Sequence, residues 1–424
     1  MKRLLALAVL LAVPTSALAE EGWTVKGWLS TGSRNFLVDR DRGLKDDNVN
    51  LEGEVELTWD SGGPFRARLR PRLAVDVLES SRNRYEPLDA YVEGTWGDFN
   101  LRAGQMIESW KIVDTFNPAD ILNRRDLERD FYDPNPLKLG EVMLRLRYAL
   151  PQMGGMRQPA VSLYLLPLFR ETPLPGNEDR FRFDINGDNR GDLLRDGIRP
   201  NTEIAYATRV AATVFDADVF AFYFGGPGRI PSFAVTSPTF DQLRPVYYRV
   251  DMVGGGLQWP VGPFLIKFEN AYTFTQNNGL PDRFQSVVPD SYYQFVIGID
   301  RTFTDILGKN EITVTVEFAG ENNPGTSTLK DLRPYKSDLF VGVRWQFQDV
   351  RRTQVTAAAI VDVLVNEQLY KVDFETVLYK DVKLLLSGQF VNRAPLNAKD
   401  PLDRTVFNLF PDNSNVTVSL RYEF

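Results

Sequence analysis

The chain contains no cysteine and no histidine among its 424 residues. Without cysteine it can form no disulfide and no thiolate metal site, and it has no cysteine nucleophile. Without histidine it lacks the general base of a Ser-His-Asp triad and the imidazole ligands of most zinc sites. Membrane-embedded hydrolases that depend on histidine are excluded for the same reason. We therefore expect a protein that is not an enzyme and has no resident cofactor.

Net positive charge and long apolar runs are also missing. The chain has 49 Lys and Arg residues against 56 Asp and Glu residues, a formal net charge of −7. An acidic chain without basic tracts offers no electrostatic footprint for nucleic acid. Beyond residue 19, no apolar run reaches the roughly 18 residues that a membrane-spanning helix needs. The sequence therefore predicts neither a nucleic-acid partner nor a helical membrane protein.

The first 19 residues have the features of an export signal. Lys2 and Arg3 are positively charged, residues 4–13 (LLALAVLLAV) are apolar, and residues 17–19 (Ala-Leu-Ala) form a small-x-small cleavage site. A retained membrane anchor is the alternative, but the apolar run is short for that role. We expect a signal peptide over residues 1–19 and a single domain over residues 20–424.

The remaining sequence is dominated by stretches of about ten residues in which apolar and polar side chains alternate. This alternation is typical of transmembrane β-strands, which have one lipid-facing and one interior-facing side. About 18 stretches are present, with 16 as the alternative, and they begin near residues 23, 48, 65, 88, 99, 141, 160, 202, 217, 245, 263, 291, 310, 338, 353, 369, 382 and 414.

The connections between these stretches alternate between short turns and long loops. Residues 60–64 and 97–98 are examples of turns, whereas residues 34–47 and 108–140 are examples of loops. Outer-membrane barrels have this arrangement. A soluble propeller or solenoid is the alternative, but the sequence has no fixed-period repeat. The predicted fold is all-β: a transmembrane, antiparallel, up-and-down β-barrel of about 18 strands with one long in-folded loop.

Two sequence features carry a family resemblance. The last strand, NVTVSLRYEF, ends in Phe424 and resembles the assembly signal of Gram-negative outer-membrane porins. Residues 101–130 resemble a motif of poorly characterised porin-like barrels, some related to alginate-export barrels, at Gly104, Gln105, Trp110, Asn117, Pro118 and Asp120. Lys111 departs from the glycine that more often follows the tryptophan in those families, so we do not infer their substrate for this chain. The resemblance implies location in the outer membrane and recognition of the last strand by the barrel-assembly machinery.

One predicted hairpin has charged stripes on its inner side. Glutamates alternate with apolar residues on the first strand and arginines on the second: Glu52, Glu54, Glu56, Arg66, Arg68, Arg70 and Arg72. A turn centred on Gly62 would place Glu56 opposite Arg68. The stripes are predicted to line the pore, either as a charged eyelet or as an ion-paired wall that fixes strand register. The same alternation predicts further inner positions: Arg145, Arg147, Lys267, Glu269, Arg344, Lys371, Asp373 and Glu375.

The segment 108–140 is much longer than an ordinary connection, and such lengths are usually functional or disordered. Its many apolar residues favour an inward-folded constriction loop over a cap at the mouth or a loose loop. Residues 120–130 are predicted to form a short helix, with Asn117 or Asp120 as its cap. The candidate constriction residues are Trp110, Asn117, Asp120, Arg124, Arg125, Asp126 and Arg129.

A weak calcium motif lies further along the chain, at Asp184, Asn186, Asp188 and Asp192. Its spacing fits part of a calcium loop, but Asn189 replaces the expected glycine and Arg195 replaces the final glutamate. A polar loop tip without bound metal is the preferred interpretation.

Together these features predict an outer-membrane channel for passive diffusion of small solutes or ions through a charged, loop-constricted lumen. Its expected partners are outer-membrane lipid, the assembly machinery and two further copies in a homotrimer. The alternative is a scaffold barrel that houses a partner protein, such as an electron-transfer or export component. An active-transport receptor fits poorly because strand-like alternation begins near residue 23 and leaves no room for a plug domain.

Overall fold

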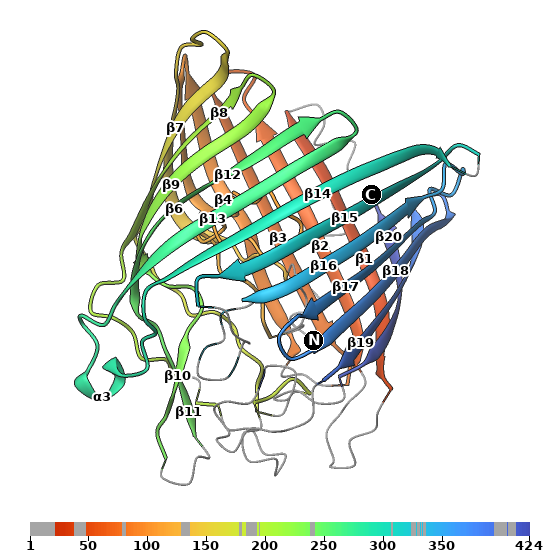
Figure 1. Ribbon diagram of the computed structural model, residues 1–424. Helices are drawn as coiled ribbons and strands as arrows, with labels where there is room; N and C mark the ends of the chain where they lie inside the picture. The colour runs from red at the N-terminus through yellow and green to blue at the C-terminus, as the bar shows by residue number, and fades with distance from the viewer. Residues whose placement is uncertain are drawn as a thin grey trace.

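The wall of the molecule is a ring of 18 β-strands (Figure 1). The computed structural model describes residues 22–37, 48–78, 82–128, 136–177, 180–183, 193–194, 196–237, 242–306, 308–323, 328, 331, 333, 336–393, 405 and 413–424. The wall strands are β1 (Trp23–Phe36), β2 (Asn48–Asp60), β3 (Phe65–Asp76), β4 (Arg84–Trp96), β5 (Phe99–Met106), β6 (Glu141–Ala149), β7 (Met156–Leu166), β8 (Ala205–Val214), β9 (Ala217–Pro227), β12 (Arg249–Val261), β13 (Phe264–Gln276), β14 (Tyr292–Ile306), β15 (Asn310–Glu321), β16 (Ser337–Gln346), β17 (Gln354–Asp362), β18 (Gln368–Tyr379), β19 (Val382–Asn392) and β20 (Asn415–Glu423).

Each wall strand pairs antiparallel with its neighbours in the chain, and β20 pairs with β1 to close the ring. The closing register runs from Trp28 opposite Glu423 to Phe36 opposite Asn415. The all-β, up-and-down barrel is therefore confirmed, with 18 strands rather than 16. The predicted strand starts lie within four residues of the observed ones. Closure leaves no unpaired strand edge in the wall, which is the condition for a barrel to cross a bilayer.

Side chains on the wall alternate between an outer and an inner face. On β14, for example, Ile297 is 51% exposed on the outer face, whereas its neighbour Val296 is fully buried on the inner face. Apolar residues exposed on the outer face recur around the ring: Leu69, Val92, Leu144, Leu163, Val210, Val253, Ile297, Val341, Val372 and Leu420. This continuous apolar outer surface is the face that the alternation predicted would contact lipid.

The two ends of the barrel differ in the length of their connections. Short connections such as residues 97–98, 215–216, 262–263 and 380–381 lie at one end, here called the turn end. Gly97 and Gly262 have φ of +56° and +57° in two of these turns, a conformation that glycine adopts without strain. The long connections lie at the other end, the loop end. Residues 363–367 are an exception, a short connection at the loop end.

Several long connections pack together at the loop end. The strands β10 (Ser232–Val235) and β11 (Leu243–Val246) form a separate two-stranded sheet between β9 and β12, and Leu193 and Ile198 bridge to β11. The short helix α3 (Asp282–Gln285) lies in the β13–β14 connection. Within the described residues, no helix is long and apolar enough to cross a membrane.

Candidate functional site

The charged stripes of β2 and β3 face the inside of the barrel, but their register differs from the prediction. Asp60 lies opposite Arg66 and Glu54 opposite Arg72, so paired residue numbers sum to 126 instead of 124. The turn is centred on Gly63, not on Gly62. Two side-chain caps account for this wider turn: the Asp60 carboxylate accepts the Gly62 N–H at 2.9 Å, and the Ser61 hydroxyl accepts the Gly63 N–H at 3.2 Å.

The ion pairs expected between the stripes nevertheless form, as diagonal neighbours on the sheet. Arg68 Nη2 lies 2.7 Å from Glu56, and Arg72 Nη2 lies 2.9 Å from Glu52. Arginine is long enough to reach a diagonal cross-strand residue, whose Cβ atom is about 7–8 Å away. Arg70 lies 3.7 Å from Glu54, and Arg66 instead pairs with Asp60 at 2.9 Å. Each arginine of the stripe therefore has a carboxylate within 4 Å.

Asp89 on β4 is a central member of this network that the sequence analysis missed. It is 3% exposed, and its carboxylate lies 2.8 Å from Arg70 and 3.6 Å from Arg68. The pairing of β3 with β4 shifts register at Pro71, which lies opposite Pro87. This bulge moves inner positions on β4 from even to odd residue numbers, so simple alternation could not find Asp89. Within sheets, proline is largely confined to edge strands, strand starts and bulges, so Pro71 and Pro87 were the sequence signal for this bulge.

A second charged network connects β4, β5 and β6 to the start of the long segment. The Glu108 carboxylate lies 2.8 Å from Arg145 and 3.2 Å from Arg102, and Arg102 also pairs with Glu93 at 2.8 Å. Arg145 therefore lies on the inner face, as predicted. Arg147, two residues further along β6, is exposed and has no carboxylate within 4 Å among the described residues.

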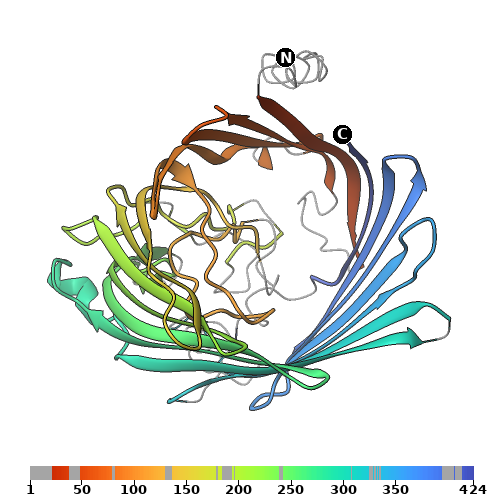
Figure 2. The same ribbon diagram turned by 90° about the horizontal axis from the view of Figure 1, so that it is seen from above.

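The segment between β5 and β6, residues 107–140, is here called the inward segment, and residues 107–128 and 136–140 of it are described. Figure 2 shows its orange trace inside the ring of strands. One docking point is Glu269 on β13, which is fully buried. Its two carboxylate oxygens accept the backbone N–H groups of Ile112 and Ala119, both at 2.9 Å. The inward fold of this segment, predicted from its length and apolar content, is confirmed.

Glu317 on β15 is a second docking point, and sequence reasoning did not select it. Its carboxylate accepts the backbone N–H of Asp114 at 2.8 Å and that of Thr115 at 3.0 Å, together with the Thr115 hydroxyl at 2.6 Å. Lys267 neutralises it at 2.8 Å and also binds Asp114 at 2.5 Å. Lys267 and Glu269 were predicted to face the lumen, and they do so as buried supports of the inward segment.

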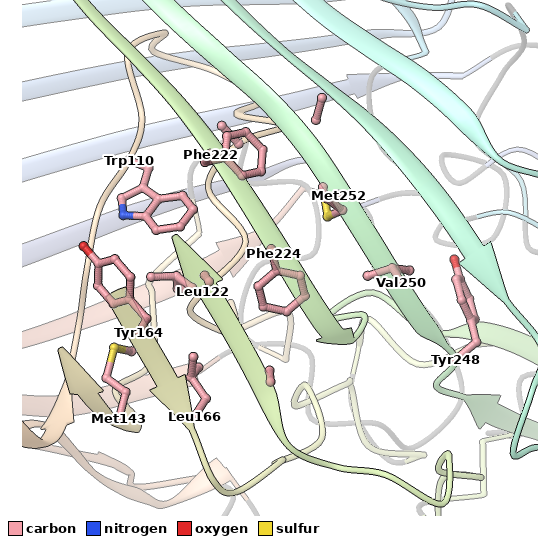
Figure 3. Close-up of a cluster of buried hydrophobic side chains, with 14 of the residues drawn as sticks. Trp110, Leu122, Met143, Tyr164, Leu166, Phe222, Phe224, Tyr248, Val250 and Met252 are labelled. Carbon is pink, nitrogen blue, oxygen red and sulfur yellow. The ribbon is translucent and has the colours of Figure 1, made fainter. Parts of the chain in front are cut away.

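Apolar contacts hold the inward segment against β7 and β9. Trp110 is 2% exposed, and its ring lies 5.4 Å from Tyr164 and 5.5 Å from Phe222, centroid to centroid (Figure 3). Tyr164 and Phe222 are inner-face residues, so this part of the wall is apolar on both faces. The apolar run of residues 219–224 (VFAFYF) was the sequence signal that the inner face of β9 is covered. A strand that is apolar on both faces is buried on both, here by lipid outside and by the inward segment inside.

The predicted helix over residues 120–130 is wrong for the described residues 120–128, which form turns and one bridge. Arg125 bridges Lys138, and the backbone of the same stretch hydrogen-bonds to the returning arm: Asp126 N–H to Leu137 O at 2.7 Å and Leu139 N–H to Arg124 O at 2.9 Å. The backbone groups are therefore satisfied by a distant part of the segment, which local propensity does not reveal.

Asp120 and Asn123 hold the two arms of the inward segment together. Asp120 accepts the Trp110 N–H at 3.2 Å and forms an ion pair with Lys138. The Asn123 side chain accepts the Glu108 N–H at 2.9 Å and donates to two backbone carbonyls at 2.9 Å. Burial lowers the pKa of Lys138, although the Asp120 carboxylate opposes that shift.

Other candidate constriction residues are also internal supports. Arg124 forms a buried ion pair with Glu141 on β6, and Asp126 lies 2.7 Å from Arg84 on β4. The Asn117 amide donates to a backbone carbonyl of its own segment. Most of these candidates thus fix the shape of the segment. Arg129 lies outside the described residues, as do the calcium candidates Asp184, Asn186, Asp188 and Asp192; within the described part of the chain, no acidic cluster could hold a metal ion.

Two cavities lie along the inner wall formed by β1–β3 and β17–β20, and residues 126, 128, 136 and 137 of the inward segment border the first of them. A cavity of about 340 Å³ is bounded by inner residues of β1–β3 and β18–β20, including Glu52, Arg72 and Lys371. A second cavity of about 380 Å³ lies along β17–β20. Both cavities include Ser387 and Thr417, so they adjoin along a wall of small polar side chains.

The sequence matches no protein-family model and no curated protein. Solved structures are similar in fold. OccK10 (OpdN) of Pseudomonas aeruginosa is 11% identical, with a TM-score of 0.51 over 95% of this chain and 99% of that chain. OccD3 (OpdP) of the same organism is 7% identical, with a TM-score of 0.50 over 95% of this chain and 91% of that chain. A mutant of the Rh. blastica porin is 11% identical, with a TM-score of 0.43 over 95% of this chain and 100% of that chain.

Proposed function

We propose that the protein is an outer-membrane channel through which small solutes diffuse passively. The observation that carries the proposal is a closed 18-stranded barrel with an apolar outer face and adjoining polar cavities along β1–β3 and β17–β20. Barrels of 16–18 strands leave an aqueous path unless they are plugged. The described part of the inward segment contacts β4–β7, β9, β13 and β15, and its residues 126, 128, 136 and 137 border the first of these cavities, which extends from there along β1–β3 and β18–β20. The fold similarity to solved porin-type barrels supports a channel over an enzyme.

The cellular setting follows from the same surfaces. The continuous apolar outer face fits outer-membrane lipid, and β20 with Phe424 fits recognition by the barrel-assembly machinery. A homotrimer also remains part of the proposal. The interpretation of the weak calcium motif as a polar loop tip without bound metal also remains a prediction, because its four candidate residues lie outside the described ranges.

Solute flux into liposomes tests the proposed activity. Proteoliposomes containing the purified barrel should swell in small sugars, and the rate should fall steeply as sugar size increases, because the inward segment narrows the lumen. Heat-denatured protein in matched liposomes is the control. Absence of swelling with correctly folded barrel, together with co-purification of a protein that fills the lumen, would instead support the scaffold function.

The paired stripes of β2 and β3 are proposed to stabilise register rather than to select ions. Arg68→Glu places a third carboxylate beside Glu56 and Asp89, so the yield of folded barrel should fall to roughly half or less. The exchange variant Glu56→Arg with Arg68→Glu restores opposite charges and should recover most of that yield. Its reversal potential under a salt gradient should equal that of the wild type. A shifted reversal potential in the exchange variant would show that the pair forms a selectivity eyelet.

A further inference from the structure

A third, chemically different cavity lies between the inward segment and another part of the wall. It has a volume of about 150 Å³ and lies between that segment and β12–β14. Its apolar lining comes from four parts of the chain and includes Phe116, Ile121, Leu127, Leu174, Ile230, Val250 and Met252. Figure 3 shows Val250 and Met252 along β12, beside the buried aromatic cluster. A cavity of about this volume with an apolar lining accommodates a benzene-sized body.

One wall of this cavity carries a guanidinium group that forms no ion pair with any residue in the described ranges. Arg229 is 5% exposed, and among the described residues its Nε, Nη1 and Nη2 atoms have no hydrogen-bond partner. Its guanidinium carbon lies 5.7 Å from the centroid of the Phe169 ring. A buried ionised group without partners is costly, and such a group in a native structure requires an explanation.

Nearby carboxylates do not resolve this imbalance, because they are already engaged. Glu141 forms an ion pair with Arg124 and lies 3.6 Å from Arg170. Burial lowers the pKa of Arg229, and Arg124 and Arg170 act in the same direction while Glu141 opposes it. The local excess of positive charge therefore persists around the unpaired guanidinium.

The other charged residues of the cavity add to this excess. Arg125, Arg229 and Arg333 line it, against one acidic residue, Asp120, which is held by Lys138. Arg333 lies 3.1 Å from Glu321, and Arg125 lies 3.7 Å from Asp120. These two arginines have their own partners and supply positive potential, whereas Arg229, which also lines the cavity, has three guanidinium nitrogens without a hydrogen-bond partner among the described residues.

We propose that this cavity binds a small monocarboxylate whose apolar body has about the size of a benzene ring, with its carboxylate on Arg229. The fork of guanidinium donors matches the two oxygens of a carboxylate, and such charge-assisted hydrogen bonds are strong where water is excluded. The apolar lining takes the rest of the ligand out of water. The ligand also touches Phe116 and Ile121, so it wedges the inward segment against β12. The proposal does not rest on passive transport.

Equilibrium binding tests the site directly. The full-length purified barrel, in a zwitterionic detergent that has no carboxylate, is titrated calorimetrically with benzoate and with hexanoate. Benzyl alcohol and inorganic phosphate serve as comparators that lack the charge or the apolar body. We expect saturable binding of benzoate at least about tenfold tighter than either comparator. Equal affinity for benzyl alcohol, equal affinity for phosphate, or no saturable benzoate binding up to about 10 mM would each overturn the proposal.

Variants assign the binding to the cavity. Arg229→Gln should weaken benzoate binding at least about tenfold, Arg229→Lys should weaken it less, and Ile121→Trp should remove it by filling the cavity. Arg147→Gln, on the exposed inner face of β6, is the matched control and should bind as the wild type does. Each variant is first shown to be folded by its heat-dependent electrophoretic shift. Wild-type affinity in Ile121→Trp or in a folded Arg229→Gln variant would overturn the assignment, as would loss of binding in Arg147→Gln.

Discussion

Replacing Glu269 and Glu317 together by glutamine should raise single-channel conductance by roughly twofold or more, because charge-assisted hydrogen bonds of about 1.5–3 kcal/mol each then no longer hold the inward segment. Both oxygens of each carboxylate accept N–H groups in the wild type. A glutamine side chain has only one acceptor oxygen, so its amide N–H₂ must face one of those donors. The segment should therefore leave the wall of β13 and β15 and widen the aqueous path.

The matched control for that experiment is Glu311→Gln. Glu311 lies on β15, the strand of Glu317, at an odd-numbered position of the same face, and no hydrogen bond or ion pair joins it to the described part of the inward segment. Its conductance should equal that of the wild type. Wild-type conductance in the double variant, with correct folding, would show that the segment does not narrow the path. An increase in Glu311→Gln as large as that in the double variant would show that only the lost charge matters.

Removing the Phe424 ring should reduce the yield of closed barrel by roughly fivefold, because it opens the packing at the strand pair that completes the ring. Phe424 exchanges two backbone hydrogen bonds with Gly27, both at 2.9 Å. The ring lies over Gly27, where a Cβ atom would be only 2.5 Å from Phe424 Cζ. Phe424→Ala keeps the backbone bonds but uncovers this contact. Gly27→Val forces the ring away and also crowds the Glu54 carbonyl oxygen on β2, which would be 2.7 Å from the added Cβ atom. Both variants should lower the heat-modifiable fraction after refolding into lipid vesicles.

Phe274→Ala is the control for the experiment on the β1–β20 pair that closes the ring. Phe274 is 47% exposed on the outer face of β13, far along the ring from the β1–β20 pair, so its loss removes comparable aromatic area without touching closure. Its refolding yield should stay close to that of the wild type. Equal losses in Phe274→Ala and Phe424→Ala would contradict a special role for the closing contact and would indicate a general dependence on outer-face aromatic area.

The architecture could be predicted because it depends on a repeated local pattern. In β14, for example, more buried inner residues and more exposed outer residues alternate from Gln294 to Arg301, so strand position and facing follow from the sequence there. Register could not be predicted as securely. The β2–β3 turn is widened by the side chains of Asp60 and Ser61, which shifts the pairing by two residues. The bulge at Pro71 and Pro87 then reverses the inward phase on β4 and conceals Asp89.

The inward segment shows where long-range contacts decide structure. That this segment folds into the barrel could be predicted from its length and from apolar residues such as Trp110. Its backbone conformation could not, because the hydrogen bonds that replace a helix come from residues 137–139 and from Glu269 and Glu317 on distant strands. These two carboxylates occupy ordinary inner positions in the sequence pattern. Only the folded structure distinguishes a carboxylate that docks backbone amides from one that faces water.

Single-channel recording of the wild-type barrel tests the central claim most directly. Purified protein, free of other chains and shown to be folded, is added to a planar lipid bilayer in concentrated salt. A passive channel predicts discrete, ohmic conductance steps whose size is unchanged by the direction of the applied voltage. A folded barrel that inserts into the bilayer but gives no steps would contradict the proposal that its lumen is an open path for small solutes.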